Sequence, residues 1–188
     1  MYFISTECRN VTYSIDMLRL KSTMTFNEFS EIEFRFKSIW SNYVKNYYNS
    51  FNYTDFKYNY VIEIEEGKSF WFGFCHNTES NSVSDCARYN FTIEFNPNKL
   101  KENGIILYIL NRVGDWVIKS YDIAMDIPIN ILDLCGFDKG RKHEIKTISS
   151  GFDNKTIYMG KSNNSVKIYN KKIESNLDIK NELTRCEV

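Results

Sequence analysis

The chain of 188 residues has 24 basic and 24 acidic side chains and therefore a formal net charge of zero. Its hydrophobic fraction of 43% and charged fraction of 26% are typical of folded globular proteins and exclude an intrinsically disordered chain. No segment approaches the roughly 20 apolar residues of a membrane-spanning helix, and the N-terminus lacks the features of a signal peptide, so we expect a cytoplasmic protein with no membrane partner.

The first half of the chain predicts strands and one long helix. Thr25, followed three residues later by Glu28, forms a capping box that places a helix start at residue 26. Behind it, apolar residues at helical spacing from Phe29 to Tyr47 predict an amphipathic helix with an aromatic stripe in the core. The expected elements are a strand over 10–22, this helix over 26–48, a hairpin of 56–65 with 69–76 around Glu66-Gly67, and a strand over 88–95.

The second half predicts another helix and a series of strands. Asn96-Pro97 indicates a helix start, with Asn as the N-cap and Pro at the first helical position. Apolar residues continue this helix to Leu110, although Gly104 weakens it. The other expected elements are a strand over 116–127, a short helix or turn near 130–136, a strand near 142–149, a hairpin of 155–160 with 165–171, and a strand over 183–188.

Together these elements predict an α+β fold, in which a single antiparallel sheet has helices packed on one face. No linker, repeat or low-complexity segment divides the sequence, so we expect residues 1–188 to form one domain. Because the final strand ends without a turn or tail, we expect this domain to be truncated at its C-terminus relative to its parent protein.

Cysteine and histidine patterns exclude several kinds of chemistry. The five cysteines are scattered, with no Cys-x-x-Cys pair, which predicts reduced thiols and no zinc site. His76 and His143 are far apart and share no motif, so neither a histidine-dependent triad nor a two-histidine metal site is supported. P-loop and dinucleotide-binding motifs are also missing from the sequence. Any chemistry must therefore use carboxylates, Lys, Arg and Tyr.

Residues 139–172 form a basic stretch within this neutral chain. They contain nine Lys or Arg against Glu144 and Asp153, a net charge of +7, whereas residues 1–138 carry −5 and residues 173–188 carry −2. Clustered positive charge is typical of a surface that contacts phosphates. The alternative is an ordinary lysine-rich hairpin in solvent.

The strand over 116–127 contains a pair of acidic residues. Alternation places Asp122, Ala124 and Asp126 on one face of this strand. Two carboxylates about 7 Å apart at strand rise could bind Mg²⁺ or Mn²⁺, because these hard cations prefer oxygen ligands. Two carboxylates on a solvated sheet face are the alternative.

Tyr169 is the most suggestive residue in the basic stretch. Alternation places Lys167, Tyr169 and Lys171 on one face, with Val166 and Ile168 on the other. A phenol has a pKa near 10 and must lose its proton to attack phosphorus, and nearby ammonium groups favour the phenolate. The alternative is a structural aromatic ring covered by lysine stems.

The last strand offers a third pair, since Arg185 and Glu187 share a face. A surface ion pair between these two side chains is the simplest interpretation of their spacing. Neither residue alone indicates a specific chemistry.

In their order along the chain, five short segments resemble blocks of the replication initiators of Gram-positive rolling-circle plasmids, the staphylococcal type of the Rep or replication initiation factor family. The segments are Asn96-Pro97-Asn98-Lys99-Leu100, Asp122-Ile123-Ala124-Met125-Asp126, Thr156-Ile157-Tyr158-Met159-Gly160, Lys167-Ile168-Tyr169-Asn170-Lys171-Lys172-Ile173-Glu174 and Arg185-Cys186-Glu187. The resemblance covers about residues 90–188. It departs from the family pattern at Lys167, where Arg is usual, so a bidentate fork is lost.

This resemblance implies a nicking domain related to the HUH endonucleases, with carboxylates largely in place of the histidine pair. Tyr169 would be the nucleophile, and Lys171 would be its phosphate or phenolate partner. The implied ligands for Mg²⁺ or Mn²⁺ are Asp122, Asp126 and Glu187, with Glu174 as a further ligand or supporting residue. The expected DNA-binding residues are Lys155, Lys161, Lys167, Lys172 and Arg185.

The implied function is plasmid replication initiation, by metal-dependent nicking and rejoining of DNA through a tyrosine–5′-phosphate intermediate at a rolling-circle origin. Expected partners are origin DNA, single-stranded or as an extruded hairpin, and the host helicase and polymerase; a homodimer is left open. Tyr158 is the rival nucleophile. Two other functions compete: a non-catalytic DNA-binding or regulatory remnant, and a protein-interaction module. The module predicts that Tyr169 and the acidic residues do not converge.

Overall fold

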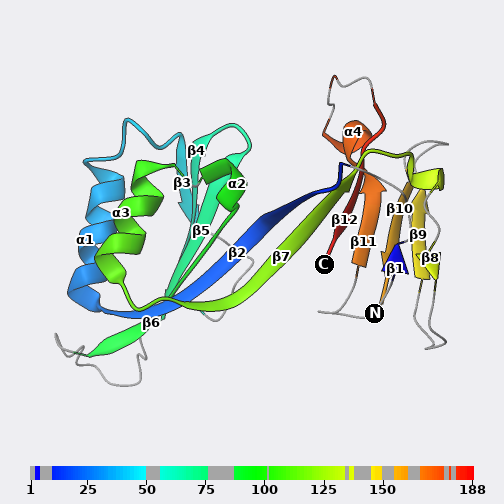
Figure 1. The fold of residues 1–188 in the computed structure, drawn as a ribbon. Helices are drawn as coiled ribbons and strands as arrows, with labels where there is room; N and C mark the ends of the chain where they lie inside the picture. The colour runs from blue at the N-terminus through cyan, green and yellow to red at the C-terminus, as the bar shows by residue number, and fades with distance from the viewer. Residues whose placement is uncertain are drawn as a thin grey trace. The chain divides into compact units, whose positions relative to one another are not determined.

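The computed structural model describes residues 3–4, 10–49, 56–75, 87–100, 102–133, 136–137, 145–149, 155–160, 166–175, 178 and 181–188. The chain divides into two compact units, the central unit, Ile15–Tyr121, and the terminal unit, Met1–Ser14 with Asp122–Val188 (Figure 1). Both boundaries lie inside long strands, β2 (Thr12–Thr25) and β7 (Val117–Ile127). The boundaries therefore have the composition of strands and not of linkers. That residues 1–188 act as a single nicking domain stays a prediction.

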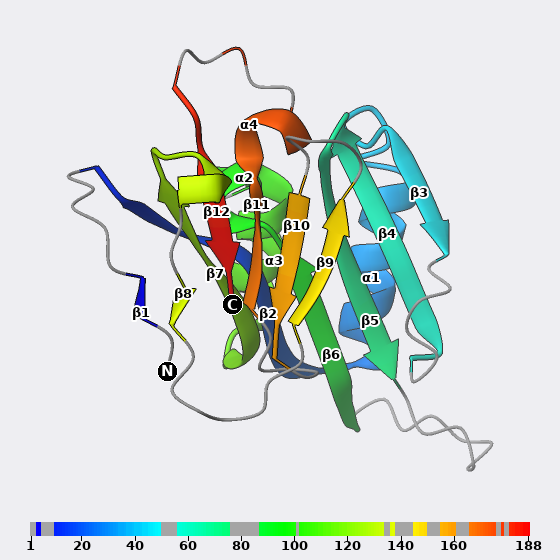
Figure 2. The ribbon, with the colours of Figure 1, turned by 90° about the vertical axis from the view of Figure 1, so that its right-hand side faces the viewer.

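In the central unit, antiparallel strands pair in the order β3-β4-β5-β6-β2. The new strands are β3 (Asn46–Asn49), β4 (Tyr58–Glu65), β5 (Lys68–Cys75) and β6 (Arg88–Phe95), and β4, β5 and β6 lie side by side in Figure 2. The predicted hairpin around Glu66-Gly67 is confirmed. Gly67 has a φ of 70°, a left-handed conformation that glycine adopts without steric cost.

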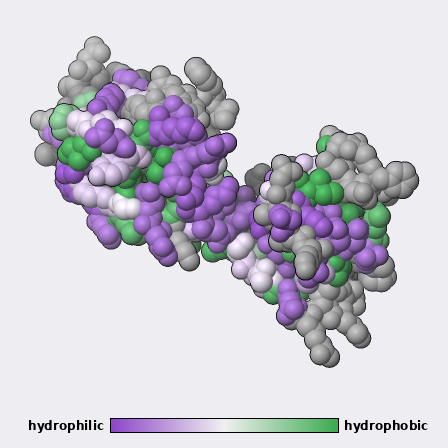
Figure 3. All heavy atoms as spheres, turned by 90° about the horizontal axis from the view of Figure 1, so that it is seen from above, coloured by the Kyte–Doolittle hydropathy of each residue, from purple (hydrophilic) through white to green (hydrophobic). Residues whose placement is uncertain are grey.

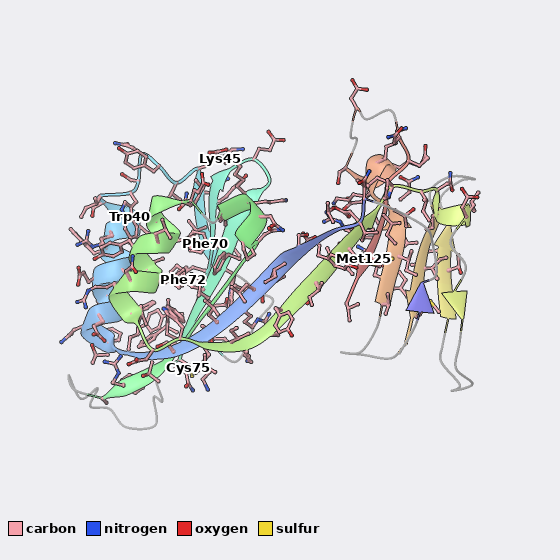
Figure 4. The ribbon with its side chains drawn as sticks, viewed as in Figure 1. Trp40, Lys45, Phe70, Phe72, Cys75 and Met125 are labelled. Carbon is pink, nitrogen blue, oxygen red and sulfur yellow. The ribbon has the colours of Figure 1, made fainter. Side chains whose placement is uncertain are left out.

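Helices α1 (Phe26–Lys37) and α3 (Gly104–Val113) share one core with this sheet. Its buried residues include Phe29, Ile32 and Phe36 from α1, Ile105, Ile106 and Ile109 from α3, and Phe70, Phe72, Phe74, Phe91, Ile93 and Phe95 from β5 and β6. Phe36 stacks on Phe72 with ring centroids 5.4 Å apart. Phe72 and Phe70 lie between the helices and β5 (Figure 4). Burial of each such side chain stabilises the unit by roughly 1.5–3 kcal/mol.

The first predicted helix is correct at its start and wrong at its end. The capping box at Thr25 is present, and α1 begins at the following residue. The helix ends before Ser38, whose backbone N–H and hydroxyl both donate to the carbonyl of Phe34, at 3.0 and 2.6 Å. Residues 46–49 pair with β4 as a strand, and Tyr43 is 69% exposed instead of buried in a helical stripe. Pairing with the sheet edge therefore replaces the last predicted turns of helix.

The helix predicted from Asn96-Pro97 is two helices. The first, α2 (Pro97–Leu100), ends after one turn. Asn103 then caps α3, because its side-chain oxygen accepts the backbone N–H groups of Ile105 and Ile106, at 3.0 and 3.2 Å. Gly104 is thus the first residue of the second helix and not an interior weakness of a longer one.

In the terminal unit, antiparallel strands pair in the order β7-β12-β11-β10-β9. The remaining elements are β12 (Thr184–Glu187), β11 (Val166–Asn170), β10 (Lys155–Met159), β9 (Ile145–Ser149), a short pair of β1 (Phe3–Ile4) with β8 (Gly136–Phe137), a 3-10 turn at Ile131–Asp133, and α4 (Lys171–Glu174). The predicted hairpin of β10 with β11 and the predicted last strand are confirmed. Lys171, predicted to continue the strand, begins α4.

The fold is thus an antiparallel sheet framework with few helices, which agrees with the predicted α+β class. A single sheet with all its helices on one face stays a prediction. Within the described residues, no helix combines the length and the apolar character needed to span a bilayer. Hydrophilic residues cover much of the described surface seen in Figure 3, with smaller apolar patches among them.

Candidate functional site

The residues singled out by the sequence lie in two rows across β11, β12 and β7. In one row, Tyr169 lies opposite Arg185, and Arg185 lies opposite Asp126. In the next row, Lys167 lies opposite Glu187. Cross-strand partners share a face of the sheet, so these five side chains project from the same side.

Alternation explains why this face of the terminal unit is polar. The intervening residues Met125, Ile127, Ile168 and Cys186 form an apolar core on the other face, together with Ile131. Burial raises the pKa of the Cys186 thiol to about 11, so this cysteine is an unreactive part of the core. Anchored in this way, the three strands hold the polar row in a fixed register.

Tyr169 is almost completely buried, with 3% of its surface exposed. Its hydroxyl donates a hydrogen bond to the carboxylate of Glu187. The ammonium of Lys167 lies 4.1 Å from the centroid of the Tyr169 ring and 3.5 Å from Glu187. Lys171 also approaches the ring, at 5.6 Å, although it belongs to α4 and not to the strand. The predicted cluster of a tyrosine with two lysines is therefore present.

Tyr169 is a neutral phenol in this arrangement. Burial, followed by the hydrogen bond to Glu187 and its negative charge, raises the pKa of Tyr169 far above its usual value near 10, and Arg185 opposes this only in part. The expectation that neighbouring lysines favour the phenolate is therefore outweighed. The Glu187 carboxylate accepts the phenol proton in a hydrogen bond.

Arg185 and Asp126 form a two-bond ion pair across β12 and β7. The guanidinium Nε and Nη2 donate to the two carboxylate oxygens of Asp126, each at 2.6 Å, and the side chains are only 12% and 18% exposed. The sequence suggested that Arg185 would pair with Glu187, its neighbour on the same strand. The structure pairs Arg185 with Asp126 on the adjacent strand, because the cross-strand register brings the fork and the carboxylate together.

As placed, the four predicted metal ligands do not fit a shared metal site. Asp126 is bound by Arg185, and Glu187 by Tyr169 and Lys167. Asp122 is exposed on β7, and Glu174 is an exposed residue of α4. Within the part of the chain that the structure describes, no three His, Cys, Asp or Glu side chains are grouped so that they could hold a metal ion.

Among known proteins, this chain is similar to solved structures. Neither the protein-family models nor the curated proteins include a match to this chain. A similar solved structure is that of a rolling circle replication initiator protein from Geobacillus stearothermophilus, with a TM-score of 0.47 and 12% sequence identity. The similarity covers 95% of this chain and 74% of that chain.

The short helix α4 adds a residue that the sequence analysis passed over. Asn170 is buried; its side-chain oxygen accepts the N–H of Ile173 at 3.1 Å, and its amide donates to Glu182 at 3.0 Å. Asparagine at an N-cap ends β11 one residue after Tyr169 and turns the chain. The sequence contained a signal for this helix start, since Asn170 stands three residues before the apolar Ile173. The alternating pattern of the preceding strand hid that signal.

Helix α4 also carries two of the predicted lysines, each paired with a carboxylate. Lys171 contacts Glu174 at 2.8 Å, and Lys172 contacts Glu182 at 3.4 Å. Burial would raise the pKa of the Glu174 carboxyl, but the hydrogen bond from Lys171 leads the contacts that hold this pKa below its usual value. Glu174 thus stays ionised and fixes the ammonium of Lys171 near the Tyr169 ring.

The remaining predicted residues are only partly described. Lys161 lies outside the described residues, as does the side chain of Lys155, so their DNA contacts stay predictions. Tyr158, the rival nucleophile, lies opposite Lys167 and on the same face as Tyr169. The two histidines and three of the five cysteines also lie outside the described residues. A protein-interaction module predicted that Asp122, Asp126, Glu187 and Tyr169 would not converge. Tyr169, Glu187 and Asp126 share one face, but among the described residues no three acidic side chains are grouped so that they could hold a metal ion.

Proposed function

We propose that this chain nicks and rejoins DNA through Tyr169, as a replication initiator of the rolling-circle type. The observation that carries this proposal is the hydrogen bond from the Tyr169 hydroxyl to the Glu187 carboxylate, within a row that also holds Lys167 and Arg185. A nucleophile, a proton acceptor and cationic groups for a phosphate are the parts that a tyrosine-dependent strand transfer requires.

In the proposed reaction, Glu187 acts as the general base. The phenol proton passes to its carboxylate as the Tyr169 oxygen attacks phosphorus in line with the bond to the 3′ oxygen. The new bond joins the tyrosine oxygen to the 5′-phosphate, the bond to the 3′ oxygen breaks, and the leaving oxygen takes up a proton to become a free 3′-OH. Because the phosphodiester is exchanged and not hydrolysed, rejoining is the same reaction in reverse and needs no nucleotide cofactor.

Burial of Tyr169 gives the lysines a second role in this proposal. Lys167 lies over the tyrosine ring, and in this proposal its side chain moves aside as a DNA strand approaches the buried phenol. A phosphate supplies the charge that draws the ammonium group away from the ring, since Lys binds phosphate as a mobile point charge. Substrate binding and exposure of the nucleophile would then be coupled.

A requirement for Mg²⁺ or Mn²⁺ stays a prediction, and the proposed proton transfer uses only Tyr169 and Glu187. The host helicase and polymerase, a homodimer and an extruded hairpin at the origin also stay predictions. Binding to origin DNA is the part of the partner prediction that the proposed reaction requires.

The proposal is tested by covalent adduct formation. The chain is incubated with a supercoiled plasmid carrying the DNA that flanks its coding sequence, with Mg²⁺ or Mn²⁺, and protein–DNA adducts are separated on a denaturing gel. We expect an adduct from the wild-type chain and from Tyr158→Phe, and none from Tyr169→Phe. If Tyr169→Phe forms the adduct and Tyr158→Phe does not, the nucleophile is misassigned.

A non-catalytic DNA-binding protein is the second candidate, and the burial of Tyr169 favours it. A tyrosine that is 3% exposed and bound to a carboxylate has the properties of a structural residue. This candidate predicts that the wild-type chain and Tyr169→Phe bind the same DNA equally and that neither forms an adduct. Adduct formation therefore separates the two functions.

A further inference from the structure

Arg185 occupies the centre of the polar row, between the nucleophile and an acidic residue. It lies directly opposite Tyr169 on β11 and directly opposite Asp126 on β7. Cross-strand partners have Cβ atoms about 4.5–5.5 Å apart, so Arg185 and Tyr169 are direct neighbours on this face of the sheet. In agreement with this proximity, Arg185 lowers the pKa of Tyr169 against the larger effects of burial and Glu187.

Asp126 fixes the orientation of this guanidinium. Two parallel bonds of 2.6 Å define the plane of the Arg185 fork, and both side chains are largely buried. The backbone beneath is anchored as well, since the hydroxyl of fully buried Thr184 donates to the carbonyl of Ile129 at 2.8 Å and Cys186 lies in the core.

The same pair makes Asp126 a poor metal ligand. Both of its oxygens accept hydrogen bonds from the Arg185 guanidinium. A divalent cation at Asp126 would have to replace these bonds and would then face the guanidinium charge at close range, where repulsion between like charges in a partly buried site is large. A bound arginine can instead supply the positive charge that a phosphate needs.

We propose that Arg185 is the residue that contacts the scissile phosphate and that Asp126 is a positioning residue, which holds the guanidinium and does not bind a metal. The inference rests on the proposed function of Tyr169. It changes the role of Asp126, which the sequence placed among the metal ligands. Arg185 would stabilise the charge that develops on the phosphate oxygens as the Tyr169 oxygen attacks.

The test compares Asp126→Asn, Arg185→Lys and the double variant by the rate of adduct formation. Arg185→Lys keeps the charge and loses the fork, and we expect a loss of about 100-fold, the effect of removing one preorganised donor. Asp126→Asn keeps the shape and loses one acceptor of the pair, and we expect about a 10-fold loss. Because Asp126 acts through Arg185, the double variant should be no slower than Arg185→Lys, which is the non-additivity of residues that act as a unit.

Two further measurements separate positioning from metal binding and from loss of fold. The Mg²⁺ or Mn²⁺ concentration that gives half the maximal rate should be the same for the wild type and Asp126→Asn, whereas loss of a metal ligand or its support would shift it by about 10-fold or more. Glu94→Gln is the matched control, because Glu94 forms a cross-strand ion pair with Arg19 in the central unit. It should resemble Asp126→Asn in thermal stability and leave the adduct rate unchanged.

The outcomes also distinguish this inference from the proposed function. Two results overturn the inference and leave the nicking function intact. One is that Asp126→Asn shifts the metal concentration that gives half the maximal rate. The other is that Asp126→Asn lowers the rate by the same factor in Arg185→Lys as in the wild type. No adduct from the wild type under any metal condition overturns the nicking function. In that case, affinity for a single-stranded oligonucleotide decides, since unchanged binding by both Arg185→Lys and Asp126→Asn overturns the phosphate contact as well.

Discussion

Glu187→Gln is the most direct perturbation of the proposed chemistry. The carboxylate of Glu187 accepts the Tyr169 hydroxyl and pairs with Lys167 at 3.5 Å. Glutamine has almost the same shape and keeps one carbonyl acceptor for the phenol, but it cannot take up the proton. The substitution therefore removes the general base while it leaves the packing of β11 against β12 nearly unchanged.

The expected magnitudes differ between activity and stability. Loss of a positioned general base lowers a rate by roughly 10²–10⁴-fold. Exchange of a charge-assisted hydrogen bond for a neutral one costs about 1 kcal/mol of unfolding free energy. The loss in Glu187→Gln should not exceed this value, because Glu187 is partly exposed and its charge is screened. The negative charge of Glu187 also raises the pKa of Tyr169, so its removal makes ionisation of the phenol easier, an effect that opposes the loss of the base.

The assay is single-turnover adduct formation at pH 7, with denaturant unfolding of the same samples. Glu182→Gln is the control, because it makes the same chemical change at a carboxylate that contacts Asn170 and Lys172 instead. We expect Glu187→Gln to lose at least about 100-fold in rate and Glu182→Gln to keep the wild-type rate. A Glu187→Gln variant that reacts as fast as the wild type, or faster, would refute the role of Glu187 as base and show that its charge only restrains the phenol.

Three other predictions test the core, the phenol and the phosphate contact. Phe72→Ala should lower the free energy of unfolding in urea by about 3–5 kcal/mol, because Phe72 is fully buried. Phe34→Ala is the control: Phe34 is 62% exposed, so this substitution should change the free energy of unfolding by less than about 0.5 kcal/mol. Tyr169→Phe should leave the 295 nm absorbance rise near pH 10 unchanged, because the folded chain keeps this phenol protonated. The raised pKa of Tyr169 also means that the stability that comes from its neutral phenol is present below about pH 10 and is lost at higher pH. Above that pH, Tyr169→Phe should therefore lose less unfolding free energy than the wild type. An equal loss in both proteins would contradict the raised pKa. Lys167→Ala should reduce the slope of log affinity against log salt for single-stranded DNA by about 0.7, the value for one phosphate contact, and an unchanged slope would exclude Lys167 from that contact.

Elements with local signals were predicted well. The capping box at Thr25 placed the start of α1 correctly, and Gly67 marked the turn between β4 and β5. Such signals depend on residues a few positions apart, and each has a direct steric or hydrogen-bonding cause. The error at the end of α1 has the opposite origin. Aromatic residues such as Tyr43 suit both a helix face and a sheet edge, so spacing alone could not decide where the helix ends.

The candidate site was predicted in part. Period-two alternation placed Lys167 and Tyr169 on one face and Arg185 and Glu187 on one face, and the register of β11 with β12 shows that these are the same face. The partners within that face were not predictable. Arg185 is two residues from Glu187 in sequence, yet its carboxylate partner is Asp126, 59 residues away along the chain.

The sequence by itself determined which side chains share a face within a strand, because alternation follows from the geometry of an extended backbone. It did not determine where β11 ends, and Lys171 therefore lies in α4 and not on the predicted strand face. It also limited the available chemistry to carboxylates, Lys, Arg and Tyr. Only the tertiary structure decided that Tyr169 is buried against Glu187 and that Arg185 is held by Asp126. These contacts depend on strand order and register, and a shift of one residue would reverse every face. Register is set by packing of the apolar residues on the other face, which no local pattern specifies.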